Sequence, residues 1–501
     1  MLQEGAEYAG KMGTVKFIQE PRLSMRTKRA IIRGDVLSRL SRPVGSCPAS
    51  VFDCSNHSMS TETRLSVPEI AVGKYPTYHN CSGWNAMLPE RTRSSSTSVR
   101  RFGSIVIGGG YTGLAAARRI AQLRPDEQVL VLEASAIGEG SSGRNSGFVI
   151  NVPHNTKMGG HTSPLEVARK QIRIYQAGLH WLEGLVREHR IDCHWNPAGK
   201  FHAAASEAGV QNLMASLAQY REWGVNFEVF DRDALQEKLG TSHYRLGYHS
   251  PNNVFVQPAA LIRGLADSLP SNVVLVEGEA VVSLSESSPF RVTTSRAQYT
   301  ADRVVLANNG FAKALGILRD RLITIFTYAA LTPQLPESEL SKLGNAAEWG
   351  VIPANRLGTT LRRVHGGRFM VRSAYSYERE QSPSDTLAQL TSSYRRRYPH
   401  MKSHKFEYVW GGTTALTRNG ATFFGELRPG LFASLGCNGA GVLKGSTYGK
   451  LLGEMAMGAQ SSCLSDALSL EGPSWLPPEP FRRIGVVSAI KYQAALAGPE
   501  R

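Results

Sequence analysis

A short apolar run, a glycine-rich turn and an apolar helix follow one another directly, and this order constrains the fold more than any other feature. Residues 104–107 have the length of a strand, residues 108–113 form the turn, and residues 114–121 are typical of a helix. A second apolar run, 129–132, ends on Glu133. This strand–turn–helix–strand order predicts a Rossmann-like α/β unit.

Three of the four glycines in this turn have separate physical roles. Gly108 permits a tight turn after the strand, Gly110 lets the backbone approach a pyrophosphate, and Gly113 allows close packing of strand and helix. The N-terminus of the helix offers unpaired N–H groups to the phosphates. Glu133, at the end of the next strand, can accept hydrogen bonds from a ribose diol. These residues predict a dinucleotide site, with an ordinary glycine loop and a surface glutamate as the alternative.

Two further glycine-rich segments favour a flavin dinucleotide over a nicotinamide one. Residues 138–147 are dense in small and hydroxyl side chains, and Arg144 and Asn145 are candidate donors to a pyrophosphate or a planar ring. A nicotinamide-binding unit does not require this second loop. Residues 436–441 lie between a predicted strand and a predicted helix, whose N-terminus can stabilise negative charge on a reduced flavin. Taken alone, the second loop is also consistent with a flexible turn.

The middle of the chain mixes long helices with strands. Apolar or small residues from Leu165 to Val186 recur in steps of three and four and predict one buried helical stripe. Further helices are predicted around 213–220 and from Pro258 to Leu265, and strands at 273–276, 280–284, 290–294 and 303–307. This order predicts a nucleotide-binding domain built from separated segments, with a second domain inserted between them.

Composition limits the function classes. The 501 residues are 42% hydrophobic, which suits two or three globular domains, and no apolar run is long enough to predict a membrane span. The six cysteines lack metal-ligand spacing, so we predict no metal site and a reduced intracellular compartment. The net charge of +16 permits nucleic acid, anionic membrane or acidic ligands. Lysine and arginine are spread along the chain, however, which favours a solvated basic surface.

Residues 1 to about 70 differ from the rest because they are rich in serine, arginine and small residues and have no sustained period. A flexible extension, an organelle-targeting peptide and an over-extended start are the three interpretations. We expect a cytoplasmic protein, with organelle targeting by residues 1–70 left open. Residues 91–101 are interpreted as a linker into the first strand.

The motifs together resemble the D-amino-acid oxidase/glycine oxidase superfamily of FAD enzymes, with a spacing closest to its γ-glutamylputrescine oxidase-like branch. The resemblance is carried by IVIGGGYTGLAAARRIA, VLEAS, GEGSSGRNSGF and GCNGAGV…GKLLGE, and it extends from about Tyr75 to the C-terminus. It implies FAD as cofactor. Some relatives tether the flavin through a cysteine in the segment similar to residues 410–416, which has none here, so we predict non-covalent FAD. Cys437 is interpreted as an inert buried thiol rather than a tether.

The resemblance also implies a fold class and domain ranges. The expected fold is α/β with an α+β substrate part, in which a Rossmann-like FAD-binding domain is interleaved with a mixed-sheet substrate domain. The ranges are a poorly ordered basic extension at 1–74, an FAD-binding domain at 75–155 with 250–320 and 410–460, a substrate domain at 156–249 with 321–409, and a tail at 461–501 packed on the FAD domain.

The FAD contacts that the resemblance implies follow the cofactor from end to end. Glu133 and Val281 are expected at the adenosine end, residues 141–147 along the pyrophosphate and flavin, and residues 436–442 beside the ribityl chain and the pyrimidine edge. The predicted contact residues are Gly108, Gly110, Tyr111, Thr112, Gly113, Glu133, Ala134, Ser141, Ser142, Arg144, Asn145, Ser146, Gly147, Val281, Asn308, Gly310, Gly436, Asn438, Gly439, Gly441 and Val442.

The implied reaction is oxidation of a primary or secondary amine or an amino acid by hydride transfer to the flavin, giving an imine or aldehyde and, with O2, hydrogen peroxide. His154 and Lys444 are candidates for tuning the amine or the flavin, with surface or packing roles as the alternative. Arg362 or Arg372 is a candidate to hold a substrate carboxylate, although both lie in a generally basic stretch. Trp410 is either an aromatic wall of the substrate site or a core residue.

Three other functions remain open at this point. One is an amine dehydrogenase that passes electrons to a quinone or a carrier protein. Another is an RNA-associated flavoprotein that uses the positive charge, but the sequence shows no RNA-binding motif with interleaved aromatics, so we predict no nucleic-acid partner. The third is a flavin-binding interaction protein without activity. The oligomeric state is left open.

Overall fold

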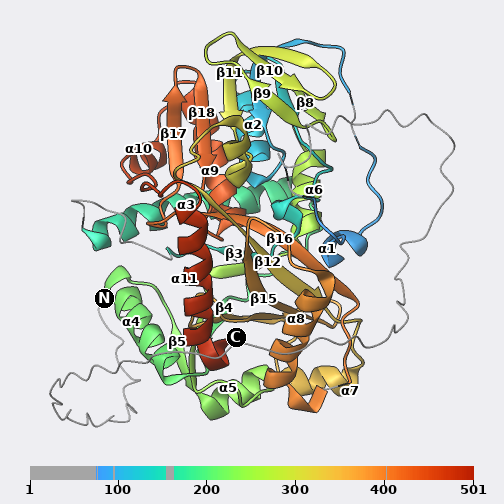
Figure 1. The fold of residues 1–501 in the computed structure, drawn as a ribbon, viewed down its shortest axis with the longest axis vertical. Coiled ribbons are helices and arrows are strands. Elements are labelled where there is room, and N and C mark those ends of the chain that lie inside the picture. The colour runs from blue at the N-terminus through green and yellow to red at the C-terminus, as the bar shows by residue number, and fades with distance from the viewer. Residues whose placement is uncertain (1–74, 76, 94–95, 154–162, 402) are drawn as a thin grey trace, which may run out of the picture. The chain divides into compact units, whose positions relative to one another are not determined.

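The computed structural model describes residues 75–501 except 76, 94–95, 154–162 and 402, and Figure 1 shows the fold as a ribbon. Two eight-stranded sheets form its framework. The strands of the first sheet are β1 (Arg101–Ile107), β2 (Val129–Leu132), β8 (Val273–Val276), β9 (Val281–Leu284), β10 (Phe290–Thr294), β11 (Gln298–Leu306), β17 (Phe423–Arg428) and β18 (Leu431–Leu435).

The centre of the first sheet is parallel. Its strand order is β17-β18-β11-β1-β2-β8, with β10 and β9 attached at β11. Strand β1 is parallel to both β2 and β11, β2 is parallel to β8, and β11 is parallel to β18. Strand β2 is buried along its whole length, as expected of a strand covered on both faces. The predicted strand–turn–helix–strand unit is therefore confirmed.

The second sheet is mainly antiparallel, with strand order β16-β12-β15-β14-β13-β4-β6-β5. A separate two-stranded sheet pairs β3 (Phe148–Ile150) with β7 (Asn253–Phe255). The strands of the second sheet are β4 (Lys200–Ala204), β5 (Glu228–Asp231), β6 (Leu246–Ser250), β12 (Ile323–Leu331), β13 (Trp349–Pro353), β14 (Thr360–Val364), β15 (Arg368–Tyr377) and β16 (Tyr408–Leu416).

Serine caps and prolines define several helix starts. Ser163, Ser206 and Ser382 each accept a hydrogen bond from a backbone N–H in the first turn of their helix. Proline occupies the first turn of the helices that begin at residues 164, 258 and 383. The helices are α1 (Gly83–Ala86), α2 (Tyr111–Leu123), α3 (Pro164–Glu188), α4 (Glu207–Trp223), α5 (Arg232–Leu239), α6 (Pro258–Asp267), α7 (Glu337–Leu340), α8 (Pro383–Arg397), α9 (Gly441–Ala456), α10 (Ser462–Leu468) and α11 (Phe481–Ala497).

The close packing of α9 on α2 depends on glycines spaced four residues apart. A Cβ on Gly445, Gly449 or Gly453 would lie 3.0, 2.1 or 3.0 Å, respectively, from atoms of α2, two of them backbone oxygens. Any larger side chain would therefore push the helices apart. The two helices begin beside the same cavity, since Tyr111 and Gly441 both line it. This packing brings two helix N-termini to one site.

Helix α3 is where the sequence predicts, and the predicted stripe is buried in large part, at Ala168, Tyr175, Leu182 and Val186. The buried face is broader than predicted, because Val167, Ile174 and Gly178 are also buried, whereas the stripe residues Leu165 and Ile172 are only half-buried. The reason is that α3 packs against both α9 and α10. A Cβ on Gly178 would lie 1.8 Å from Thr447 Oγ1 of α9, so the glycine, rather than a leucine, marks the contact face.

The fold class is confirmed, but some predicted domain ranges differ from the sheets and helix contacts. Residues 410–416 belong to β16, which pairs with β12 of the second sheet instead of joining the FAD-binding domain. Helix α3, predicted in the substrate domain, shares its core with α2 and α9. The tail divides, because α10 packs on α3 and α9 whereas α11 packs on β15. The extension at 1–74 lies outside the described residues.

No helix in the described part of the chain is long and apolar enough to cross a membrane. Within the same residues there is no cluster of three or more His, Cys, Asp or Glu side chains suited to a metal ion.

Candidate active site

A cavity of about 920 Å³ brings together the carboxyl ends of strands in the first sheet and one face of the second sheet. Most of the predicted site residues line it. They are Gly108, Gly110, Tyr111, Thr112, Glu133, Ala134, Ser141, Ser142, Arg144, Asn145, Ser146, Val281, Asn308, Asn438, Gly439, Gly441, Val442, Lys444 and Arg372. The predicted residues that do not line it are Gly113, Gly147, Gly310, Gly436, Arg362 and Trp410. His154 lies outside the described residues.

The turn after β1 has the shape that a pyrophosphate requires. Gly108 has a φ of +108°, and a Cβ on Gly113 would lie 1.8 Å from Gly108 O, so neither position tolerates a side chain. Gly110 approaches the second loop closely, because its Cβ would lie 2.8 Å from Ser142 Oγ. Gly110 occupies the N-cap position of α2 and has no side chain that could cap the helix. In the first turn, Tyr111 N donates a hydrogen bond to Ser142 Oγ at 3.3 Å. The remaining N–H groups at this helix start suit an anion.

Glu133 is fixed at the end of β2 by backbone donors. Its carboxylate accepts hydrogen bonds from Gly109 N at 2.8 Å and from Ser135 N at 3.0 Å. Burial raises the pKa of Glu133, and these two hydrogen bonds act in the opposite direction. A carboxylate held in this way keeps lone pairs free for a ribose diol, so its position fits the predicted dinucleotide.

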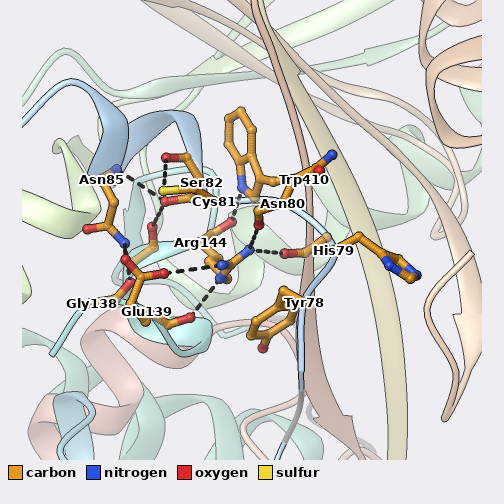
Figure 2. A network of polar contacts seen from close by, with 12 residues as sticks. Tyr78, His79, Asn80, Cys81, Ser82, Asn85, Gly138, Glu139, Arg144 and Trp410 are labelled. Carbon is orange, nitrogen blue, oxygen red and sulfur yellow. Dashed lines mark hydrogen bonds and ion pairs between the residues drawn. The ribbon is translucent and has the colours of Figure 1, made fainter. Parts of the chain in front are cut away.

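Arg144 has a different role from the one we predicted. Figure 2 shows its guanidinium enclosed by protein acceptors. Nε donates to Glu139 O at 2.6 Å, Nη1 to Asn80 O at 2.9 Å and to Gly411 O at 3.0 Å, and Nη2 to the Glu139 carboxylate at 3.2 Å. The ring of Tyr78 lies 3.8 Å from the guanidinium carbon. Arg144 therefore holds the 138–147 loop in place, with most of its donors satisfied by the protein.

The segment before β1 contributes contacts that the motifs did not reveal. We call residues 78–88 the N-terminal clasp. Ser82 Oγ donates to Gly143 O at 3.2 Å, Trp84 Nε1 to Asn145 O at 2.8 Å, and Asn85 Nδ2 to Gly138 O at 2.8 Å. Figure 2 shows part of the clasp packed around Arg144. The only sequence signal for it is that the family resemblance begins at Tyr75, well before the first strand.

The third glycine loop is fixed by two asparagines. Asn438, at φ +53°, donates from Nδ2 to Gly436 O at 2.8 Å and accepts at Oδ1 from Thr417 N at 2.9 Å. Asn309, which the sequence did not single out, accepts at Oδ1 from Gly436 N at 2.9 Å. Its neighbour Asn308 lines the cavity, and its buried Oδ1 has no hydrogen-bond partner among the described residues. An acceptor left open in this way fits a cofactor N–H or O–H group.

Lys444 presents an amine to the cavity from the first turn of α9. Its Nζ donates to Thr422 Oγ1 at 3.3 Å, and in the described chain no carboxylate lies within ion-pair distance. Burial lowers the pKa of Lys444 to about 8, and the neighbouring Cys437 acts in the opposite direction. The amine can therefore gain or lose a proton slightly above neutral pH.

The second sheet adds a cation on its cavity face. Arg372 on β15 is half-buried, and its Nη1 donates to Tyr375 OH at 2.7 Å. Both residues line the cavity, together with Tyr328 of β12. Among the described residues that line the cavity, Glu133 is the only one with a carboxylate side chain. Among the described residues, the cavity face of the second sheet therefore presents a guanidinium and no carboxylate.

Arg362 and Trp410 correct two of our substrate-binding predictions, because neither reaches the cavity. Arg362 is 1% exposed, its Nη1 donates to Val256 O at 2.7 Å and to Ser146 O at 3.1 Å, and burial lowers its pKa to about 10. Trp410 is equally buried, and its Nε1 donates to Arg144 O at 3.0 Å. Both side chains therefore donate hydrogen bonds to backbone oxygens of the 138–147 loop without lining the cavity.

The parallel sheet, the two uncapped helix N-termini and the fixed glutamate surround one large cavity, and this arrangement is that of a dinucleotide-binding protein. The family comparison agrees, since residues 104–455 match the family of FAD dependent oxidoreductases abbreviated DAO. The chain belongs to this family, uses FAD, and is an oxidoreductase of the amine and amino-acid oxidase type.

The chain is also similar to individual relatives and solved structures. It is 27% identical over 381 residues to gamma-glutamylputrescine oxidoreductase of Escherichia coli, covering 75% of this chain and 87% of that one. It is 26% identical over 427 residues to the probable oxidoreductase OrdL of Rhizobium meliloti, covering 82% and 96%. Glycine oxidase from Geobacillus kaustophilus has the same fold, with a TM-score of 0.63, 18% identity, and 73% of this chain and 96% of that chain covered.

Proposed function

We propose that this protein oxidises the C–N bond of an amine or amino acid that carries a carboxylate, of a γ-glutamylputrescine-like, sarcosine-like or related kind. The observation that carries the proposal is the cavity face of the second sheet, where Arg372 has no ion-pair partner among the described residues. A guanidinium next to an open space is a strong partner for a substrate carboxylate. The relatedness to gamma-glutamylputrescine oxidoreductase supports an amine of this class.

The residues of this chain divide the work between binding and protonation. When bound, FAD supplies the acceptor for a hydride. The α2 and α9 N-termini, Glu133 and Asn308 would hold it. Cys437 is half-buried and lines the cavity, which corrects our prediction of a buried thiol, but residues 410–416 contain no cysteine, and we propose non-covalent binding. Arg372 orients the substrate through its carboxylate. Lys444 Nζ can hold or release a proton close to the substrate, which must bind as the neutral amine to react.

The expected products are an imine, which water hydrolyses to a carbonyl compound, and hydrogen peroxide if O2 is the final acceptor. The alternative is a dehydrogenase that uses a quinone or a carrier protein. Peroxide formation under air, measured with and without an artificial acceptor, separates these two functions.

The reaction is tested by adding amines without oxygen and recording the flavin absorbance. The panel pairs γ-glutamylputrescine with putrescine and sarcosine with dimethylamine, so that each pair differs in the carboxylate-bearing part. We expect bleaching by at least one carboxylate-bearing amine, and release of free FAD on denaturation. A flavin that stays oxidised with every amine contradicts amine oxidation.

Arg372→Met tests the carboxylate contact. A charge-assisted hydrogen bond contributes about 1.5–3 kcal/mol, so KM for the carboxylate-bearing substrate should rise about tenfold to a hundredfold, with FAD content unchanged. Arg368→Met is the matched control, because Arg368 lies on the same strand but pairs with Glu407 outside the cavity. Equal KM changes in the two variants would remove Arg372 from substrate binding.

A further inference from the structure

A second cavity, of about 90 Å³, lies beside the active-site cavity. Lys444 and Thr422 line both, so the hydrogen bond from Lys444 Nζ to Thr422 Oγ1 lies at the boundary between the two cavities. The lining of the smaller cavity also includes Glu471 and Gly472, which are exposed residues that follow α10. We call this cavity the side pocket. It connects the amine of Lys444 with the protein surface.

Two buried polar side chains line the side pocket without a protein partner. Gln171 of α3 is 3% exposed and Tyr448 of α9 is 4% exposed, and among the described residues neither side chain has a hydrogen-bond partner. Leaving such a group unpaired costs about 1–3 kcal/mol, so buried polar groups in folded proteins nearly always pair with protein or with ordered water. The two side chains therefore indicate that the side pocket binds water.

The side pocket has the size and the lining of a small hydration site. One water occupies roughly 30 Å³ in the liquid, so several waters fit in the pocket. Lys444 and Tyr448 are four residues apart on α9, which places both on the same face of the helix. Gln171 lines the pocket from α3, which packs on α9. The Tyr448 ring packs on Phe424, with centroids 5.1 Å apart, and this contact holds its hydroxyl in place.

The titratable groups around Lys444 lie on two sides. Cys437 is its neighbour on the active-site side, where both line the larger cavity. Tyr448 and the exposed carboxylate of Glu471 lie on the side of the pocket. Burial raises the pKa of Tyr448, so its hydroxyl keeps its proton and can both donate to water and accept from it. Lys444 is thus placed to receive a proton from one cavity and to release it into the other.

We propose that the side pocket holds a chain of water molecules that carries protons from Lys444 to the solvent during amine oxidation. This inference rests on the proposed function, because an amine that binds as an ammonium must lose a proton before it can give up a hydride. An N–H bond of the substrate ammonium breaks, and an N–H bond of Lys444 forms. Lys444 then passes a proton to the pocket water, and the water passes one to the solvent, so that Lys444 is neutral again for the next turnover. Gln171 and Tyr448 are positioning residues, which hold the water and do not line the active-site cavity.

The double variant Gln171→Met/Tyr448→Phe tests the water chain, because it removes two water partners and keeps the side chains close to their original size. In dilute buffer we expect kcat to fall at least about tenfold, since a positioned proton transfer contributes about 10²–10⁴-fold to a rate. Each single variant should show a smaller fall. A single anaerobic turnover above pH 8 should be unchanged, because Lys444 then starts as the free amine. KM and FAD content should also be unchanged, and added imidazole should restore kcat by carrying the proton itself.

Tyr175→Phe is the matched control, because Tyr175 is a buried tyrosine of α3 that lines neither cavity. Its kcat should equal that of the wild type, with or without imidazole. Equal kcat for the wild type and the double variant in dilute buffer overturns the proposal, and so does a loss of kcat that imidazole does not restore.

A crystal structure of the FAD-loaded wild type gives a measurement that does not depend on turnover. We expect ordered water within hydrogen-bond distance of Gln171, Tyr448 and Lys444. A side pocket without ordered water overturns the proposal even if amines are oxidised. If the water is present but no amine reduces the flavin, the proposed function is wrong and the proton path falls with it.

Discussion

At the residue scale, the burial of one ionisable side chain, Lys200, opposes the stability of the fold. Lys200 on β4 is 0% exposed, and its Nζ has one hydrogen bond, to Asn252 O at 3.5 Å. Burial lowers its pKa to about 7. A lysine whose pKa is lower in the folded than in the unfolded chain opposes folding while it is charged. Stability should therefore rise with pH from about 7 towards the unfolded pKa of about 10.4.

Lys200→Met removes this titration. We expect the variant to be more stable than the wild type by a few kcal/mol at neutral pH, with the difference shrinking as the pH rises towards about 10.4. Urea unfolding at several pH values measures it. Lys342→Met, at an exposed lysine, should leave the pH dependence unchanged. Parallel pH curves for wild type and Lys200→Met would show that the pKa of Lys200 is the same in the folded and the unfolded chain, and would contradict the prediction.

At the residue scale, the sequence predicted which loops surround the cofactor but not how their side chains are used. Gly108 and Gly113 were predictable because a short-range motif dictates their backbone geometry. The partners of Arg144 were not, because Asn80 and Gly411 lie far away in sequence and no local pattern encodes that meeting. Arg362 was misassigned for the same reason, since its acceptors belong to other elements.

At the scale of elements, the glycines of α9 set the distance to α2. Gly449→Ala places a Cβ 2.1 Å from Thr112 O, so we expect a loss of about 1–3 kcal/mol in unfolding free energy. Gly184→Ala in α3 is the control, because a Cβ added there would meet no other atom within 4 Å. It should gain about 0.5–1 kcal/mol from helix propensity alone. A stabilised Gly449→Ala variant would contradict the packing argument.

Strands and helices were predicted well where a single pattern governs them. Residues 129–132, 273–276 and 290–294 form strands with the predicted limits. The half-buried positions Leu165 and Ile172 of α3 were not predictable, because contacts with two neighbouring helices decide which residues of α3 are buried. The pairing of β16 with β12 was missed because a strand's sheet depends on long-range partners rather than on its own composition.

At the scale of the whole molecule, the cavity draws its walls from both sheets, so FAD should stabilise the entire fold. We expect the thermal midpoint of the cofactor-free protein to rise continuously with added FAD, by the equivalent of about 2.7 kcal/mol at a hundredfold excess over Kd. Differential scanning calorimetry measures the shift, with NAD as the control ligand. A midpoint that does not respond to FAD would contradict the assignment of the cavity.

The interleaved order of the two sheets was predictable from the separated glycine motifs, whereas the helix contacts that cross between them were not. Helix α11 illustrates the difference. Its sequence carries no motif, and only the structure shows that Val486 and Ile490 face the cavity while Phe481 and Tyr492 face away.

The N-terminal clasp also bears on how the protein is made. Arg144 joins Asn80 of the clasp to Gly411 of β16, and the α9 N-terminus begins only at Gly441. During synthesis the clasp and the first glycine turn leave the ribosome early, but Gly411 and the start of α9 follow hundreds of residues later. The nascent chain therefore exposes an incomplete cradle for most of translation, and capture of the cofactor is a late step in the biogenesis of this enzyme.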